Sequence, residues 1–264
     1  MRGTLIKYGS AIAVALGISV SASAATLFHD DFEGASLDGA WLLEHSQGGA
    51  GAGPPEWVHD GGVLSQTQPA PGDPTYAIIL GGGWPESYSV VAKVRIDDWE
   101  DHDRSRAGVG MWLDEADNYN GYTWLIHERL TDTNMEFLND ARAWLNEEGT
   151  FEVVLGDWYW VKAFIDAGTG EIMGKIWAAS AGDHDPSTTS EPADWMQTRV
   201  YGDLGSLRPA TSAAGLNGGA GTGGGHSTVS FDDVFVFDAG GPDVLTAVDP
   251  AGKVSTTWAG LKSR

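Results

Sequence analysis

The clearest pattern of apolar and polar positions lies in the second half of the chain. Two runs rich in aromatic and β-branched residues, Trp158–Asp166 and Glu171–Ala179, flank a short connection that contains Gly168 and Gly170. This arrangement predicts a β-hairpin. The first run is apolar on both of its alternating faces except at Lys162, whose stem can lie along apolar surface with its ammonium at the edge. A strand that is apolar on both faces favours a two-layer structure, so we expect this hairpin in the middle of a β-sandwich.

Other strands are expected on both sides of this hairpin. Tyr88–Asp97 alternates between apolar and polar positions, which is typical of a strand with one buried face. In Arg106–Asp114, Gly108 and Gly110 fall on the face shared with Trp112, and their missing side chains leave room for a ligand to approach the backbone. About a dozen short strands separated by Gly, Asp and Asn turns predict an all-β fold, an antiparallel β-sandwich of the jelly-roll type.

The two ends of the chain differ from this pattern. Residues 1–24 carry two basic residues, an apolar run and Ala22-Ser23-Ala24, which together indicate a signal peptide with cleavage after Ala24. We therefore expect a protein that is secreted, periplasmic or on the cell surface, and no later apolar run is long enough to span a membrane. One domain is expected over residues 25–239. Residues 240–264 contain too few apolar residues for a core, so we expect a flexible C-terminal tail.

Charge narrows the range of partners. The chain has 15 Lys and Arg against 37 Asp and Glu, a net charge of −22. Such a field repels phosphate backbones, which makes nucleic acid an improbable partner, and it attracts cations. The absence of cysteine excludes disulfides as a source of stability outside the cell.

An ordered set of sequence phrases resembles a known superfamily. The phrases are LFHDDFEG, WVHDGGVL, ESYSVVAKVRI, RAGVGMWLD, NYNGYTW, WYWVKAFID and VSFDDVFVFD. As a set they resemble the concanavalin A-like lectin/glucanase jelly-roll superfamily, with laminin-G-like and 3-keto-disaccharide-hydrolase-type domains of exported bacterial proteins as the nearest relatives. The resemblance implies binding of carbohydrate or protein, glycosidase or lyase activity in some members, and a structural calcium near paired N- and C-terminal strands.

That implied pairing of the terminal strands would bring acids from both ends of the chain together. Calcium prefers oxygen ligands, so the carboxylates could hold one ion between the first and last strands. Alternation along Thr228–Asp238 places at least one of the two acids there on an inward face. The alternative is that these residues are solvated turn acids in an acidic protein. The candidate ligands are Asp30, Asp31, Glu33, Asp232 and Asp233.

The surplus of tryptophan, 12 residues in all, suggests a carbohydrate site. Sugars present flat apolar faces and hydroxyl rims, which exposed aromatic rings beside polar groups can bind. The alternative is that each of these aromatic residues belongs to the core. The candidate carbohydrate-binding residues are Arg106, Trp112, Tyr119, Trp124 and Trp144.

No catalytic residues are identified. The chain lacks the Glu-x-Asp-x-x-Glu of retaining glycosidases in this superfamily, a Gly-x-Ser-x-Gly elbow and a cysteine nucleophile. His102 and His127 are interpreted as ordinary surface or edge residues, and alternation puts His127 and Tyr122 on opposite faces. The leading hypothesis is an exported, non-catalytic, lectin-like module that binds an extracellular glycan and holds a structural calcium. The alternatives are a secreted polysaccharide-active hydrolase or lyase and a cell-surface structural or adhesion protein.

Overall fold

The structure is a computed structural model. It describes residues 25–37, 39–44, 56–68, 75–81, 84–99, 105–114, 121–128, 133–139, 144–200, 208, 212–220 and 226–238. The expected signal peptide, the expected tail and Tyr119 lie outside these residues.

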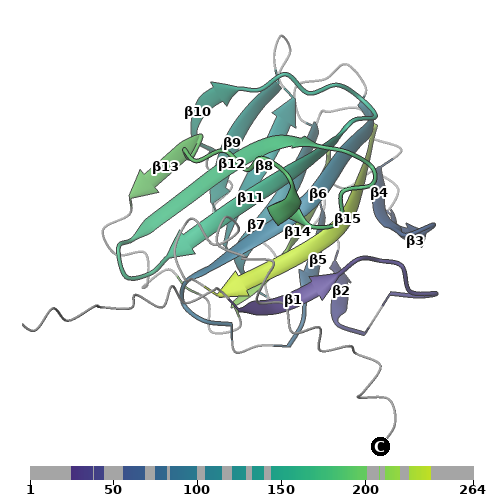
Figure 1. Ribbon diagram of the computed structural model, residues 1–264, viewed down its shortest axis with the longest axis horizontal. Helices are drawn as coiled ribbons and strands as arrows, with labels where there is room; N and C mark the ends of the chain where they lie inside the picture. Colours follow the sequence, from purple (N-terminus) through teal and green to yellow (C-terminus); the bar gives the residue numbers. More distant parts are fainter. Residues whose placement is uncertain are drawn as a thin grey trace, which may run out of the picture.

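The described residues form two antiparallel sheets that pack face to face (Figure 1). Sheet A has the spatial order β13 (Gln197–Val200), β12 (Glu171–Ala179), β11 (Trp158–Asp166), β6 (Tyr88–Trp99), β15 (Ser227–Asp238), β4 (Val63–Gln68) and β3 (Glu56–Asp60), and β1 (Thr26–Asp30) also pairs with β15. Sheet B has the order β10 (Trp144–Thr150), β9 (Thr133–Asn139), β8 (Tyr122–Glu128), β7 (Ser105–Asp114), β14 (Ser212–Ala220), β5 (Thr75–Ile79) and β2 (Trp41–Glu44). The all-β sandwich expected from the strand pattern is confirmed. Among the described residues, no helix has the length and apolar character needed to cross a membrane.

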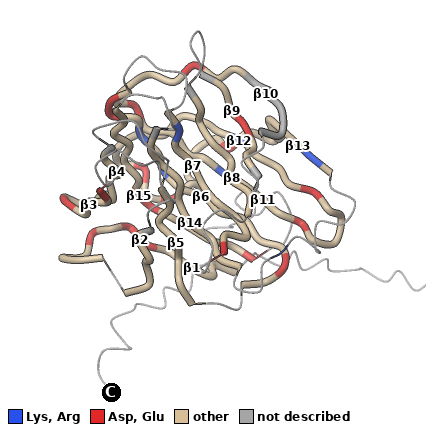
Figure 2. The backbone as a smooth tube through the Cα atoms, turned by 180° about the vertical axis from the view of Figure 1, so that it is seen from behind, with Lys and Arg blue, Asp and Glu red and all other residues tan. Residues whose placement is uncertain are grey.

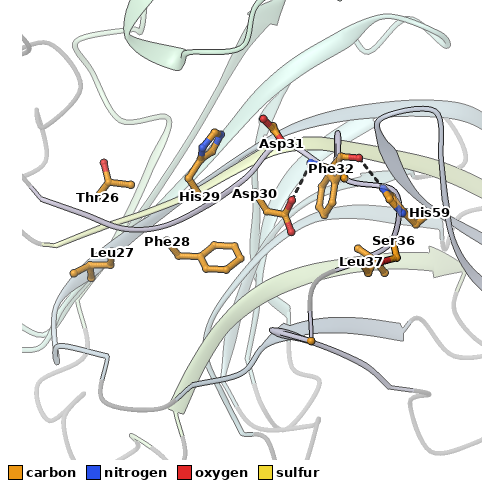
Figure 3. A pocket seen from close by; sticks show the side chains of 12 residues that line it. Thr26, Leu27, Phe28, His29, Asp30, Asp31, Phe32, Ser36, Leu37 and His59 are labelled. Carbon is orange, nitrogen blue, oxygen red and sulfur yellow. Dashed lines mark hydrogen bonds between the residues drawn. The ribbon is translucent and has the colours of Figure 1, made fainter. Parts of the chain in front are cut away.

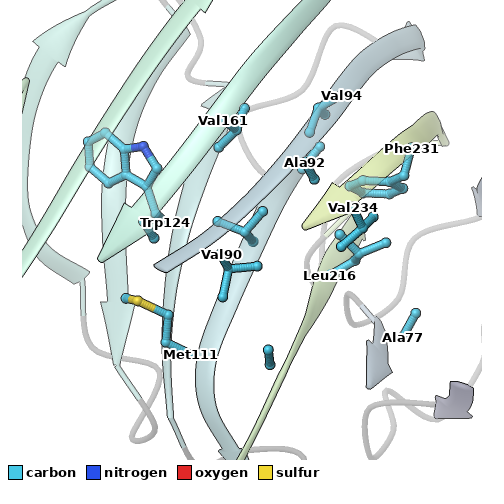
Figure 4. Close-up of a cluster of buried hydrophobic side chains, with 14 of the residues drawn as sticks. Ala77, Val90, Ala92, Val94, Met111, Trp124, Val161, Leu216, Phe231 and Val234 are labelled. Carbon is cyan, nitrogen blue, oxygen red and sulfur yellow. The ribbon is translucent and has the colours of Figure 1, made fainter. Parts of the chain in front are cut away.

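The core lies between the two sheets and is built from alternate residues of their strands. Val90, Ala92 and Val94 of β6 face Met111 of β7 and Leu216 of β14, and all five are completely buried (Figure 4). The hairpin expected around residue 167 is formed by β11 and β12, which pair along their whole length, and β11 then pairs with β6. The hairpin is therefore inside sheet A, as the pattern predicted.

The first and last strands lie side by side, as the resemblance implied. β1 runs antiparallel to the second half of β15, with Asp30 opposite Val234. At the other end of this pair, the amide of Ala25 donates to Asp238 Oδ1 at 2.8 Å and the amide of Asp238 donates to the carbonyl of Ala25 at 3.0 Å. The first half of β15 pairs instead with β4, so β15 changes its neighbour partway along.

A segment between β12 and β13, residues 180–196, covers part of the outer face of sheet A and contains the short 3₁₀ helix η1 (Pro186–Thr188). We call it the covering segment. Its Glu191 accepts hydrogen bonds from Lys162 Nζ at 2.7 Å and Lys175 Nζ at 2.5 Å, and its Trp195 stacks on Phe164. Lys162 is thus completely buried and paired, which corrects the expectation that its ammonium lies at the sheet edge.

Two of the β-bulges lie at a non-glycine residue with a positive φ and shift the alternation of side chains. In β7 the register against β14 shifts between Gly110 and Leu113, and Trp112 has a positive φ of 52°. In β15 the register against β6 shifts after Asp232, and Asp233 has a positive φ of 46°. A bulge whose first residue is left-handed bends the strand and redirects the residues around it.

Acidic residues are spread over turns and strand ends throughout the described part of the molecule, and basic residues are few on this view (Figure 2). The acidic residues coloured in this view are therefore not confined to one patch.

Candidate functional site

Trp112, a candidate carbohydrate-binding residue, lies in the core. The bulge in β7 turns its side chain between the sheets, where it is completely buried, while Leu113 takes the outer face instead. The backbone amide of Trp112 donates to the Tyr88 hydroxyl at 2.7 Å, and its indole donates to the carbonyl of Glu86 at 3.1 Å. Burial raises the pKa of Tyr88 far above its usual value, so this hydroxyl stays protonated and donates to the carbonyl of Ala213 at 3.0 Å.

Trp124 is also a core residue. Its ring is completely buried, packs against Phe137 and lies across the bare backbone of Gly174. Its indole donates to the carbonyl of Lys175 at 3.2 Å, so the polar edge of the ring is satisfied inside the protein. Neither Trp112 nor Trp124 can contact a sugar at the surface.

The outer face of β7 is closed rather than open. A Cβ atom at Gly108 would lie 2.0 Å from the carbonyl oxygen of Trp124, and one at Gly110 would lie 2.7 Å from Leu113 Cδ1. These glycines therefore allow close packing within the protein and do not leave a channel along the strand. Arg106 is half-buried on this face. Trp144 begins β10, but its side chain, like Tyr119, lies outside the described residues.

The same face of sheet B carries a buried hydrogen-bonded pair of titratable side chains. His127 Nδ1 lies 3.0 Å from Glu136 Oε2 across β8 and β9, and both side chains are almost fully buried. His127 is thus an interior residue, which corrects its interpretation as a surface residue. Tyr122 faces the core on the opposite side of β8, as alternation predicted.

The acids of the first segment make local contacts. Asp30 accepts hydrogen bonds from the amide of Phe32 at 2.9 Å and from the indole of Trp41 at 2.7 Å. Asp31 accepts from the amide of Glu33 at 3.1 Å, and both Asp31 and Glu33 are exposed. These contacts hold the chain as it leaves β1.

The acids of the last strand surround a lysine. Lys93 Nζ lies 2.8 Å from Asp232 Oδ2 and 3.1 Å from Asp233 Oδ2, and all three side chains are buried. His184 Nδ1 of the covering segment lies 2.9 Å from Asp233 Oδ2, and His29 Nε2 of β1 lies 3.9 Å from Asp233 Oδ1. Sequence reasoning missed Lys93 and both histidines. The alternation of apolar and polar residues along Tyr88–Asp97 could have identified Lys93, because it placed this lysine on the polar face of the strand.

The two carboxyl groups have opposite pKa shifts. Burial raises the pKa of Asp232, the negative charge of Asp233 adds to this effect, and the bond to Lys93 offsets part of it. Burial acts on Asp233 in the same direction, but the imidazole of His29 and the ammonium of Lys93 outweigh it and hold the pKa of Asp233 below its usual value. Asp233 is therefore the group that is firmly ionised.

The donor set does not fit the calcium site that the resemblance implied. Among the described residues, the His, Asp and Glu side chains close enough to share an ion are His184, Asp232 and Asp233, a group that excludes the three acids of the first segment. Calcium takes roughly six to eight oxygen ligands at about 2.3–2.6 Å. Here an ammonium lies between the two carboxylates at hydrogen-bonding distance. The neighbouring terminal strands are present, but the cage of five carboxylates is not.

A large pocket lies along β1 and the segment that follows it (Figure 3). Its volume is about 970 Å³, and its lining includes every residue from Thr26 to Phe32 together with His59 of β3. In Figure 3, His29 and Asp31 point to one side of β1, and Phe28 and Asp30 point to the other. His59 Nε2 lies 2.7 Å from the carbonyl oxygen of Phe32 and so connects the far wall to β1.

This pocket combines aromatic surface with hydrogen-bonding groups. Phe28 and Leu37 supply apolar contacts, while Asp31, His29 and Ser36 supply donors and acceptors. The described residues of its lining include carboxylates but no lysine or arginine. Such a surface can bind a polar, uncharged molecule through hydroxyl groups and an apolar face. Sequence reasoning singled out the acids here but not the pocket, because its described walls come from the segment Thr26–Leu37, from Gly39 and from His59, which meet only in the folded protein.

Comparison with known proteins identifies the fold. No protein-family model matches this chain, and the search of curated proteins gives no match. Among solved structures, basic winged bean lectin with Tn-antigen is 10% identical, with a TM-score of 0.56 over 81% of this chain and 98% of that chain. The lectin from Bauhinia forficata in complex with GalNAc is 8% identical, with a TM-score of 0.55 over 81% and 98%. Lectin I from Ulex europaeus, with the methyl glycoside of α-L-fucose, is 9% identical, with a TM-score of 0.54 over 82% and 98%. The chain therefore has the concanavalin A-like jelly-roll fold, which confirms the fold that the resemblance implied.

Proposed function

We propose that this chain is an exported carbohydrate-binding module without catalytic activity. The observation that carries the proposal is the match over about four-fifths of the chain to lectins whose structures contain GalNAc, an α-L-fucoside and Tn-antigen. A fold supports many functions, so the proposal also needs a site on this chain. The residues that resemble a signal peptide support export. The described group of His184, Asp232 and Asp233 has the ammonium of Lys93 between its two carboxylates, so the proposal does not include calcium there.

The binding site in this proposal is the pocket along β1. Ligand pockets commonly measure about 300–1,000 Å³, so a pocket of about 970 Å³ can accept a saccharide of one or two units. Asp31 offers an exposed carboxylate to sugar hydroxyls, and His59 fixes the opposite wall. The other candidate surface, the outer face of β7, is closed at its glycines, and the indoles of Trp112 and Trp124 are in the core. The pocket is therefore the better candidate.

The test is a glycan array on the purified chain, followed by calorimetric titration of the best ligand. Asp31→Asn keeps an oxygen that can accept from the Glu33 amide but removes the charge of a residue that lines the pocket. We expect affinity to fall at least about tenfold, since a hydrogen bond to a charged group contributes roughly 1.5–3 kcal/mol. Glu152→Gln changes an exposed acid that is not part of the pocket lining and serves as the control.

Three outcomes would change the proposal. No binding to any glycan on the array would contradict the function. Unchanged affinity in Asp31→Asn would move the site away from this pocket. Release of shorter or unsaturated sugars during incubation would favour the hydrolase or lyase alternative, because a binding module leaves its ligand intact.

A further inference from the structure

We infer that the chain contains a cation site that is filled by its own ammonium group. In this inference, Lys93 takes the place of a structural metal ion and joins β6, β15 and the covering segment. The inference does not rest on the proposed carbohydrate binding, although His29 lines the pocket and also lies beside Asp233. The resemblance implied a calcium ion at the paired terminal strands, but the structure places the ammonium of Lys93 between the carboxylates of Asp232 and Asp233. The inference follows from this difference.

Four oxygen atoms surround the ammonium. Lys93 Nζ donates to the carbonyls of Ala181 at 3.3 Å and Asp183 at 2.8 Å. It also contacts Asp232 Oδ2 at 2.8 Å and Asp233 Oδ2 at 3.1 Å. Two carboxylates and two carbonyls are the ligand types of a hard cation, but the distances are those of N–H···O hydrogen bonds.

The backbone of β15 makes this arrangement possible. Consecutive residues of a regular strand point to opposite faces, so two neighbouring aspartates could not share one partner. The bulge and the left-handed conformation of Asp233 place both carboxylates on the outer face of sheet A, opposite Lys93. Aspartate tolerates this conformation better than most residues, but the conformation still has a cost. The shared ammonium accounts for a bulge at this place, where β15 also changes its neighbour from β4 to β1.

An internal cation differs from a bound metal in an important respect. The ammonium is attached to β6, so its binding does not depend on the concentration of an external ion. It is completely buried beneath the covering segment. The imidazoles of His184 and His29 both lie beside Asp233, at 2.9 Å from Oδ2 and 3.9 Å from Oδ1. A divalent ion would have to displace the ammonium before it could reach the same oxygens.

The first test is on the wild-type chain. We expect the melting temperature to be the same in EDTA and in millimolar Ca²⁺ or Mn²⁺, and the purified protein to contain no stoichiometric metal by elemental analysis. A drop in melting temperature on chelation, or one equivalent of tightly bound metal, would overturn the inference.

The second test removes the ammonium. Lys93→Ser leaves both carboxylates and both carbonyls around an opened space, so the variant should melt well below the wild type in EDTA and recover most of that loss in Ca²⁺ or Mn²⁺. Lys162→Ser is the matched control, because it also removes a buried lysine from the same face but leaves the single carboxylate of Glu191. It should lose stability without recovery by metal.

If Lys93→Ser does not fold, two further measurements still test the inference. Refolding of that variant with and without metal should give folded protein only with metal, and equal failure in both would count against a cation site. Asp232→Asn, a milder change at the same site, should lower the melting temperature by less than Lys93→Ser. If it had no effect, the carboxylate would not be holding the ammonium.

Discussion

Gly174 shows how strongly a single position can depend on having no side chain. A Cβ atom there would lie 2.2 Å from Cδ2 of the Trp124 indole, which is far below any normal contact. The indole is held from its other side by Phe137 and by its bond to the carbonyl of Lys175, so it cannot move away freely. The glycine therefore sets the spacing between β12 and β8.

We expect Gly174→Ala to lower the free energy of unfolding by about 1–3 kcal/mol, because overpacking a tight core forces side chains off their preferred rotamers. Gly182→Ala is the control, since nothing lies within 4 Å of a Cβ atom at that position. It should change the unfolding free energy by less than about 0.5 kcal/mol. Urea denaturation of both variants measures the difference, and equal stabilities would show that Trp124 can move aside.

The face of a strand on which an individual side chain lies was the hardest feature to predict from the sequence. Strict alternation placed Trp112 on the same face as Gly108 and Gly110 and separated Asp232 from Asp233. A bulge at each place shifts the alternation by one, which buries Trp112 and brings the two acids onto one face. Neither bulge contains the glycine that usually marks one, because Trp112 and Asp233 adopt positive φ themselves.

At the scale of elements, the covering segment has the largest unexpected role. Residues 183–192 are mostly polar, and apart from the short helix η1 they have little regular structure. Polarity alone could not show that the loop folds onto sheet A. Its contacts are specific: Trp177 donates to Thr189 Oγ1 at 2.8 Å, and Lys175 donates to the carbonyl of Pro192 at 2.8 Å.

We expect Glu191→Gln to destabilise the protein by about 3–5 kcal/mol, because the change leaves the buried ammonium groups of Lys162 and Lys175 without their shared negative charge. Asp194→Asn, an exposed position in the same segment, is the control and should be nearly neutral. Thermal and urea unfolding give the comparison. A small effect of Glu191→Gln would mean that the two lysines reach water or lose a proton when the carboxylate is absent.

Strand positions were predicted well from sequence, and sheet order was not. The hairpin of β11 and β12 and the long strands β6, β7 and β15 follow from local alternation, glycine and aromatic content. Their neighbours in space depend on contacts between distant parts of the chain, such as β6 with β11 and β15 with β4. The pairing of β1 with β15 was expected only through the resemblance to a known superfamily.

At the scale of the whole molecule, the pairing of β1 with β15 joins the first and last described strands. The ends of the expected domain, Ala25 and Asp238, are joined by two hydrogen bonds, and Asp30 at the end of β1 holds the indole of Trp41. β1 is therefore part of the folded unit rather than an appendage.

We expect a chain of residues 25–239 to melt at the temperature of the full-length chain, because it retains every described strand. A chain of residues 31–239 lacks β1, which leaves the second half of β15 at a sheet edge and the Trp41 indole without its acceptor. It should melt at a clearly lower temperature or fail to fold. Equal melting of the two fragments by circular dichroism would show that β1 adds nothing to stability.

The pairing of the two ends also determines how the domain would respond to mechanical force. Because β1 and β15 are antiparallel and Ala25 lies beside Asp238, tension applied through both ends acts first on the outermost bonds of this pair. The strands would peel apart one hydrogen bond at a time instead of sliding past each other with all bonds loaded together. A domain held in this way should yield at low pulling force, even where its resistance to heat is high.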